Sequence, residues 1–101
     1  MSASSGLDPL IHPVGRLQIF AVLSAVAEAE FSMVRDAVGV SDSVLSKHVK
    51  LLEDAGYLKV RKASSGGRQR TWLASTGKGK AAFAGHVAEL TRLAGLAGVA
   101  P

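Results

Sequence analysis

Residues 32–72 read SMVRDAVGVSDSVLSKHVKLLEDAGYLKVRKASSGGRQRTW, and this stretch decides the fold. Near its middle, Leu45, Val49 and Leu52 follow the i, i+4, i+7 spacing that places side chains on one side of a helix. Ser41 supplies an N-cap oxygen ahead of them, and Gly56 tolerates the left-handed conformation of a C-cap. The pattern predicts an amphipathic helix over about residues 42–55.

The opposite side of this predicted helix carries small hydroxyls and cations. The residues that cluster there are Ser43, Ser46, Lys47 and Lys50, with no acidic residue among them before Asp54. Such a face suits a DNA groove, but many surface helices have a polar face. The case for DNA therefore depends on the neighbouring segments.

A shorter apolar helix is predicted just upstream. Its apolar positions are Met33, Val34, Ala37 and Val38, and it stops at Gly39. Two short helices joined by a turn that contains glycine form a helix-turn-helix. In that arrangement the second helix is the one that enters the major groove of DNA.

Two strands are predicted downstream, because residues 57–62 and residues 70–74 alternate apolar and polar side chains. We expect a loop over residues 63–69, with Gly66 and Gly67 at a flexible tip. Residues 59–80 hold seven cations and no acidic residue, which is unusual for a merely solvated hairpin. The predicted fold is a winged helix-turn-helix, mainly α with a small β-hairpin wing (α+β).

Residues 40–58, VSDSVLSKHVKLLEDAGYL, resemble the recognition-helix segment of small bacterial transcription regulators related to the MarR, PadR and ArsR groups. The wing with GRQRTW and the following STGKGK strengthen the similarity to compact MarR-like regulators, which extends over about residues 7–96. The resemblance implies two sets of DNA-contacting residues. In the major groove these are Ser43, Val44, Ser46, Lys47, His48 and Lys50, and at the DNA backbone or minor groove they are Arg68 and Arg70.

The resemblance has one local departure. Relatives often carry a longer polar residue where this chain has Val44. An isopropyl group cannot form hydrogen bonds with a base edge, so we expect it to contact a thymine methyl group instead.

The charge distribution agrees with a nucleic-acid partner. Of the 12 cations and 8 acidic residues in the 101-residue chain, residues 32–80 hold ten cations and four acidic residues. Positive charge concentrated in one region attracts phosphate. The length predicts one domain over residues 7–97, between a flexible tail at 1–6 and a frayed end at 98–101.

The remaining composition excludes several classes of protein. There is no cysteine, so disulfides and thiol-based sensors are ruled out. The first residues lack the features of a signal peptide and no later run is long enough to span a bilayer, so we expect a soluble cytoplasmic protein without membrane contact. The three histidines lack ligand companions at suitable spacing, and no catalytic arrangement emerges. We expect no metal, no cofactor and no enzymatic activity.

Two long apolar segments suggest a homodimer. Helices are predicted over about residues 13–27 and from residue 75 or 76 to about 96, and both are apolar over more than one face. The candidate dimer residues are Leu17, Phe20, Phe83, Val87, Leu90 and Leu93. Alternatively, the two helices pack on each other in a monomer. In the resembling families the first and last helices form the dimer interface, and a two-fold dimer would recognise a palindrome.

The sequence therefore favours a dimeric, sequence-specific regulator that binds double-stranded DNA, acting as a repressor. A protein-interaction module that has kept this fold is the alternative, and the acid-free stretch at residues 59–80 favours DNA over it. A small-molecule effector is compatible with the first hypothesis, although no convergent polar residues identify a ligand.

Overall fold

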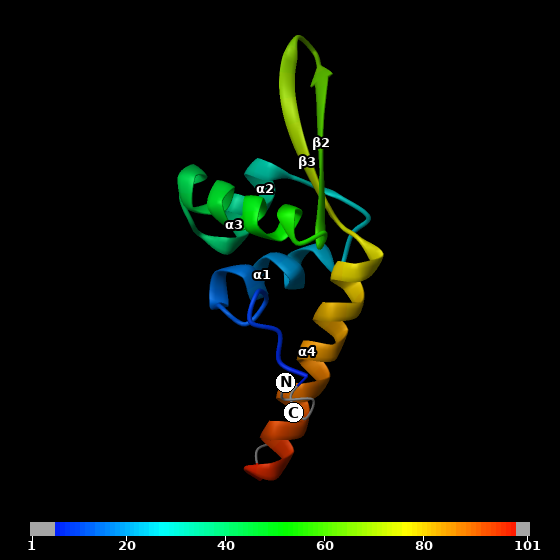
Figure 1. Ribbon diagram of the computed structural model, residues 1–101. Helices are drawn as coiled ribbons and strands as arrows, with labels where there is room; N and C mark the ends of the chain where they lie inside the picture. The colour runs from blue at the N-terminus through cyan, green and yellow to red at the C-terminus, as the bar shows by residue number, and fades with distance from the viewer. Residues whose placement is uncertain (1–5, 99–101) are drawn as a thin grey trace.

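The computed structural model describes residues 6–98, which form four helices and a three-stranded sheet (Figure 1). Along the chain these are α1 (Val14–Leu23), β1 (Ala29–Glu30), α2 (Phe31–Val38), α3 (Asp42–Asp54), β2 (Leu58–Ser65), β3 (Arg68–Ser75) and α4 (Gly77–Leu96). The predicted fold class is therefore confirmed. The expectations for the two chain ends concern mainly residues 1–5 and 99–101, which lie outside the described residues.

The sheet is antiparallel with strand order β1-β3-β2, and β2 and β3 form the wing. Their register pairs Ser65 with Arg68, so only Gly66 and Gly67 lie in the turn. Both glycines have positive φ, 59° and 77°, as required at the two central positions of a mirror-image hairpin turn. The prediction of a seven-residue loop was wrong, because this tight turn lets both strands continue to the tip.

The segment between α1 and α2 also differs from the prediction. Helix α1 ends at Leu23, four residues earlier than expected, and β1 follows it at Ala29–Glu30. Strand β1 was not predicted, since two residues are too short to show a periodic pattern. It exists because it pairs with the middle of β3, with Ala29 opposite Leu73 and Glu30 opposite Trp72.

The core lies between α1, α2, α3 and the base of the sheet. Its most buried apolar side chains are Ile11, Ile19, Phe20, Leu23, Val34, Leu45, Leu52 and Leu73. The wing projects from one end of this body and α4 from the other (Figure 1). The molecule is consequently elongated, with principal extents of 53 × 27 × 23 Å.

The beginning of helix α4 packs against the apolar core. Thr76 caps it by accepting the N–H of Gly79, and one turn later Phe83 stacks on Phe20 with ring centroids 5.8 Å apart. Phe20 is only 2% exposed, so the expectation that it lies at a dimer surface was wrong. Leu17 and Phe83 are also partly buried against the same core. These three residues support the alternative in which the first and last helices pack within one chain.

The later turns of α4 extend past the body. Val87 and Leu93 are 40% and 38% exposed, and Leu96 is 73% exposed. Leu90 is half-buried. Within residues 6–98, no helix combines the length and the apolar character needed to cross a membrane.

Candidate nucleic-acid interface

Helices α2 and α3 are held at their junction by local capping. Gly39 ends α2 in the left-handed conformation, with φ 79°, and Ser41 accepts the N–H of Val44 at 3.2 Å to cap α3. Arg35 on α2 donates to Asp42 at the start of α3, at 2.8 Å. Asp42 is also well placed because the N-terminus of a helix favours an anion. This junction orients α3 with one face inward and one outward.

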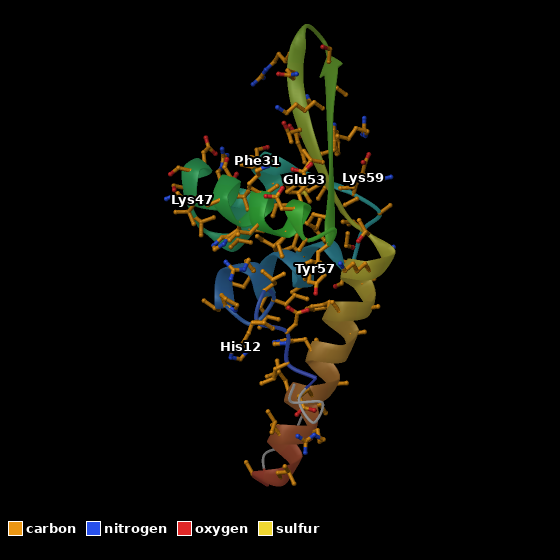
Figure 2. The ribbon with its side chains drawn as sticks, viewed as in Figure 1. His12, Phe31, Lys47, Glu53, Tyr57 and Lys59 are labelled. Atoms are coloured by element: carbon orange, nitrogen blue, oxygen red, sulfur yellow. The ribbon has the colours of Figure 1, made fainter. Side chains whose placement is uncertain are left out.

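The outward face of α3 includes the residues that the sequence pattern indicated. Leu45, Val49 and Leu52 are buried. Exposed along the middle of the helix are Ser43, Val44, Ser46, Lys47 and Lys50, with Asp42 exposed before them and Leu51, Glu53 and Asp54 after them. Figure 2 shows Lys47 on the outer part of α3, away from the wing. Hydroxyls and cations therefore predominate on the exposed face from Ser43 to Lys50, and the last turn adds Glu53 and Asp54, the latter 3.1 Å from Lys50.

The structure places His48 differently from the prediction. Its ring is half-buried against α1, so close to Gly15 that a Cβ there would lie 2.7 Å from Nε2, and its Nδ1 is 3.4 Å from Nη1 of Arg16. Burial, and then the charge of Arg16, lower the pKa of His48 below its ordinary value. His48 is therefore a packing residue between α1 and α3, not part of the outward face.

Helical geometry alone could have placed His48. At about 100° per residue it lies about 140° from Ser43 and about 40° from Leu52 around the helix axis. That angle assigns it to the buried side. The resemblance to a family motif suggested otherwise because it follows sequence position, not helix face.

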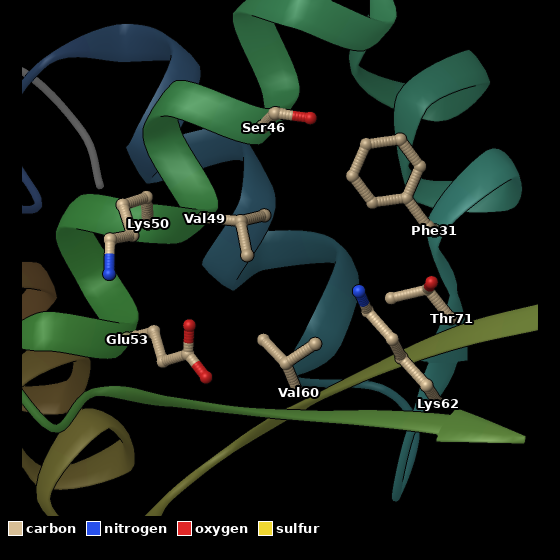
Figure 3. Close-up of a pocket in the computed structure, with 8 residues that line it drawn as sticks. All are labelled: Phe31, Ser46, Val49, Lys50, Glu53, Val60, Lys62 and Thr71. Carbon is tan, nitrogen blue, oxygen red and sulfur yellow. The ribbon is translucent and has the colours of Figure 1, made fainter.

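A groove of about 350 Å³ separates α3 from the wing (Figure 3). Val49 on α3 and Val60 on β2 contribute apolar lining, and Lys62 reaches from the wing into the space between the two elements. Ser46 and Thr71 add hydroxyl groups, while Lys50 and Glu53 line the α3 side. The groove therefore joins the exposed face of α3 to one face of the wing.

Lys62 and Thr71 were not predicted as site residues. They are directly paired across β2 and β3, two positions beyond the Val60 and Leu73 pair that faces the core. Opposed residues of an antiparallel pair share a face of the sheet. A two-residue turn at Gly66-Gly67 fixes the pairing of Lys62 with Thr71. Alternation from the inward-facing pair of Val60 and Leu73 then places Lys62 and Thr71 on the α3 side.

Arg68 and Arg70 lie on the other face of the wing by the same alternation. Arg68 is exposed near the tip. The guanidinium of Arg70 donates to Glu30 of β1 at 3.0 Å, and its Nε is buried without a partner among the described residues. Arg70 is thus not the free cation that the sequence suggested, because its charge is paired with a carboxylate at the base of the wing.

A second ion pair fastens the same face of the wing. Arg61 of β2 donates to Glu28 at 2.6 Å, and its guanidinium lies over the ring of Trp72, 5.5 Å from the ring centroid. Together, Glu28 and Glu30 hold two wing arginines. The acidic residues around β1 therefore anchor the wing and leave the cations on the α3 side exposed.

No part of residues 6–98 gathers three histidine, aspartate or glutamate side chains in a way that would hold a metal ion. A cavity between α1, β3 and α4, lined by Phe20, Phe83 and Lys80, has a volume of about 150 Å³. Pockets for drug-sized ligands are larger, about 300–1,000 Å³. This cavity is therefore too small for a drug-sized ligand.

The sequence profile of winged helix DNA-binding domains matches residues 15–94. The chain belongs to this family. The winged helix domain is also 30% identical, over 84 residues, to an uncharacterised protein of Methanocaldococcus jannaschii. That alignment covers 83% of this chain and 91% of the relative.

Solved structures share the fold of the winged helix domain. A transcriptional regulator homologue from Pyrococcus horikoshii superposes with a TM-score of 0.78 at 24% identity, over 83% of each chain. A MarR family transcriptional regulator from Silicibacter pomeroyi gives 0.68 at 26% identity, over 85% of this chain and 58% of the other. A regulator of M. tuberculosis solved in complex with DNA gives 0.70 at 22%, over 90% and 65%. The predicted resemblance to MarR-like winged helix regulators is confirmed.

Proposed function

We propose that this winged helix domain is a sequence-specific transcriptional repressor, which acts in the cytoplasm and binds double-stranded DNA as a homodimer. The observation that carries the proposal is the exposed face of α3, where Lys47 and Lys50 accompany serine hydroxyls beside the groove that leads to the wing. An exposed helix of this kind fits the major groove.

The proposed contacts divide into those that position the protein and those that select sequence. The cations that pair with phosphates, and so supply affinity without sequence preference, are Lys47 on the exposed face of α3, Lys50 and Lys62 beside the groove, and Arg68 at the tip of the wing. The residues that meet base edges are Ser43, Val44 and Ser46. A serine hydroxyl donates or accepts a hydrogen bond, and Val44 packs on a thymine methyl group. His48 and Arg70 are left out of the contact set because their contacts within the protein are partly buried, whereas Lys50 is kept because its ion pair with Asp54 is exposed to solvent.

The proposed dimer uses the part of α4 that extends beyond the body. Val87, Leu90 and Leu93 lie on this part, and at least Val87 and Leu93 expose apolar surface. A two-fold dimer presents two copies of α3 to the same side of a duplex. Its operator would be a palindrome with half-sites about 34 Å apart.

The test is binding of the purified chain to a labelled fragment of its own promoter, measured by fluorescence anisotropy at several salt concentrations with random duplex as competitor. Lys47→Ala and Lys62→Ala each remove one proposed phosphate contact. Each should weaken binding and reduce the slope of log K against log salt by about 0.9.

Lys59→Ala is the matched control, because it removes the same charge from β2 on the opposite face of the wing (Figure 2). It should leave the salt slope close to that of the wild type. Equal effects of Lys59→Ala and Lys62→Ala would remove the groove face from the proposal. No preference for the promoter over random duplex would instead favour the alternative, a winged-helix module that binds another protein through the exposed end of α4.

A further inference from the structure

A buried histidine joins residues 7–12, here called the N-terminal segment, to α4. His86, in the middle of α4, is fully buried. Its Nδ1 atom accepts the backbone N–H of Asp8 at 2.9 Å, although the two residues are 78 positions apart in the sequence. Its Nε2 atom lies 3.4 Å from Nδ1 of His12, and the two rings meet edge to face. The two histidines are 74 positions apart in the sequence.

The contact with Asp8 determines the protonation state of His86. A backbone N–H can only donate, so Nδ1 of His86 must carry a lone pair where it accepts this bond. Neutral His86 then carries its proton on Nε2 and directs it toward Nδ1 of His12. A second proton on His86 would place its Nδ1–H group against the backbone N–H group of Asp8, and neither could accept a hydrogen bond.

The carboxylate of Asp8 does not offer His86 a free counter-ion. Its Oδ2 atom accepts the hydroxyl of Tyr57 at 2.5 Å, and its Oδ1 atom accepts the N–H of Leu10 at 2.8 Å. Tyr57 lies three residues after the last residue of α3 and immediately before β2, and its N–H donates to the carbonyl of Leu52 near the end of α3 at 2.8 Å. The N-terminal segment thus contacts both α4 and, through Tyr57, the end of α3.

The charged groups around His86 do not offset its burial. Burial lowers the pKa of His86, the neighbouring His12 lowers it further, and the charge of Asp8 opposes them with a smaller effect. The hydroxyl of Tyr57 donates to the carboxylate of Asp8. Glu89, one turn along α4, accepts a hydrogen bond from Arg92. Both geometry and electrostatics therefore favour the neutral imidazole.

We propose that His86, Asp8, His12 and Tyr57 form a proton-operated latch, closed when His86 is neutral, which fastens the N-terminal segment to α4 and to the end of α3. Protonation of His86 breaks its bond with Asp8 and opens the latch. The N-terminal segment and the contact from Asp8 to Tyr57 are then released together.

The direction of the pH effect follows from the lowered pKa. The stability that neutral His86 contributes is fully present above its ordinary pKa of about 6.5, and it is lost as the pH falls through the lower value of the folded state. Because one proton is taken up, the ratio of open to closed latch rises by at most about tenfold per pH unit.

Hydrogen–deuterium exchange read by mass spectrometry tests the latch in the full chain. Exchange of the peptide that covers residues 7–12, corrected for the intrinsic pH dependence of the chemical rate, should rise several-fold between pH 7.5 and pH 5.5. His86→Gln should abolish the rise, because the amide oxygen of glutamine accepts the Asp8 N–H and does not titrate. His48→Gln is the matched control, since the pKa of His48 is also lowered by burial but this residue lies between α1 and α3, away from Asp8.

Two results would overturn the latch: corrected exchange that is the same at both pH values, or an equal rise in His86→Gln and wild type. If His86→Gln does not fold, ¹⁵N NMR of the wild-type histidines decides instead. The latch requires the Nε2–H tautomer of His86 at neutral pH, and loss of the Asp8 amide signal when His86 protonates. Protonation of His86 with an unchanged Asp8 amide would refute it.

The consequence for DNA rests on the proposed function. Opening the latch loosens the segment that bridges α4 and the end of α3, so promoter affinity should fall in mild acid in the wild type and less in His86→Gln. Absence of promoter binding at pH 7.5 would refute the proposed function and leave the exchange result standing. Binding with flat exchange would refute the latch alone.

Discussion

Replacing Gly79 by alanine tests how the first turn of α4 packs against Tyr57, in the connection between α3 and β2. A Cβ at this position would overlap the carbonyl oxygen of Tyr57 and would lie 3.2 Å from the ring of Phe20. That carbonyl cannot simply turn away, because it accepts the N–H of Thr76 at 3.0 Å. Helix α4 must therefore move by roughly 1 Å to restore an ordinary van der Waals contact.

The expected cost can be estimated against a control in the same helix. Alanine gains about 1 kcal/mol over glycine from helix propensity. Overpacking costs about 1–3 kcal/mol, and a weakened hydrogen bond from Thr76 to Tyr57 about 1 kcal/mol more. Gly79→Ala should therefore be destabilised by about 1–3 kcal/mol. Gly85→Ala, where a Cβ meets nothing within 4 Å, should gain about 1 kcal/mol.

Thermal unfolding followed by circular dichroism, at one fixed protein concentration, measures both variants. A difference of about 2 kcal/mol corresponds to at least about 8 °C in Tm for a domain of this size. Gly85→Ala should melt above the wild type and Gly79→Ala below it. A Gly79→Ala protein that melts at or above the wild-type temperature would show that α4 does not pack against Tyr57 in this way.

Four further predictions concern the wing, the core, the dimer and the Tyr57 contact. Gly66→Ala should lower the free energy of unfolding by about 1 kcal/mol in thermal melts, because a left-handed φ disfavours a side chain; Gly66→Asn should lose less, and equal losses would argue against the tight turn. Phe20→Ala should cost about 3–5 kcal/mol in urea unfolding, since its ring is buried. Leu93→Glu should keep the circular dichroism spectrum and shift sedimentation toward the monomer, and an unchanged oligomer would exclude this part of α4. Tyr57→Phe should cost about 1–2 kcal/mol through the lost bond to Asp8. That bond raises the pKa of Tyr57 from 10.0 to about 12, so its contribution is complete below pH 10 and is lost as the pH rises through about 12, where melts of the two proteins should converge.

Much of the exposed site could be predicted because its signals are local. Ser41 and Gly39 identify the helix boundaries by their own capping chemistry, and both cap as expected. The period of the apolar residues sorted Lys47 and Lys50 to the outward face of α3. The same arithmetic would have assigned His48 to the inner side, so that error came from the interpretation and not from missing information.

The wing was only partly predictable. Alternation indicated two strands, but their register depends on how many residues the turn takes, and the turn was expected to be longer than the two residues observed. This register decides that Lys62 faces α3 while Arg70 faces away. Strand β1, which provides the partner of Arg70, has only two residues and forms because β3 is there to pair with it.

The sequence by itself determined the helix-turn-helix, the presence of a wing and the concentration of positive charge on them, because capping, periodicity and charge act between residues close in the chain. The tertiary structure decided which of those charges are free and which apolar side chains are exposed. Arg70 bonds to Glu30, 40 positions away in the sequence, and His86 bonds to Asp8, 78 positions away. The ring of Phe20 is covered by the stacked ring of Phe83. Such pairs form only when whole elements pack together, and local periodicity does not encode which faces will meet.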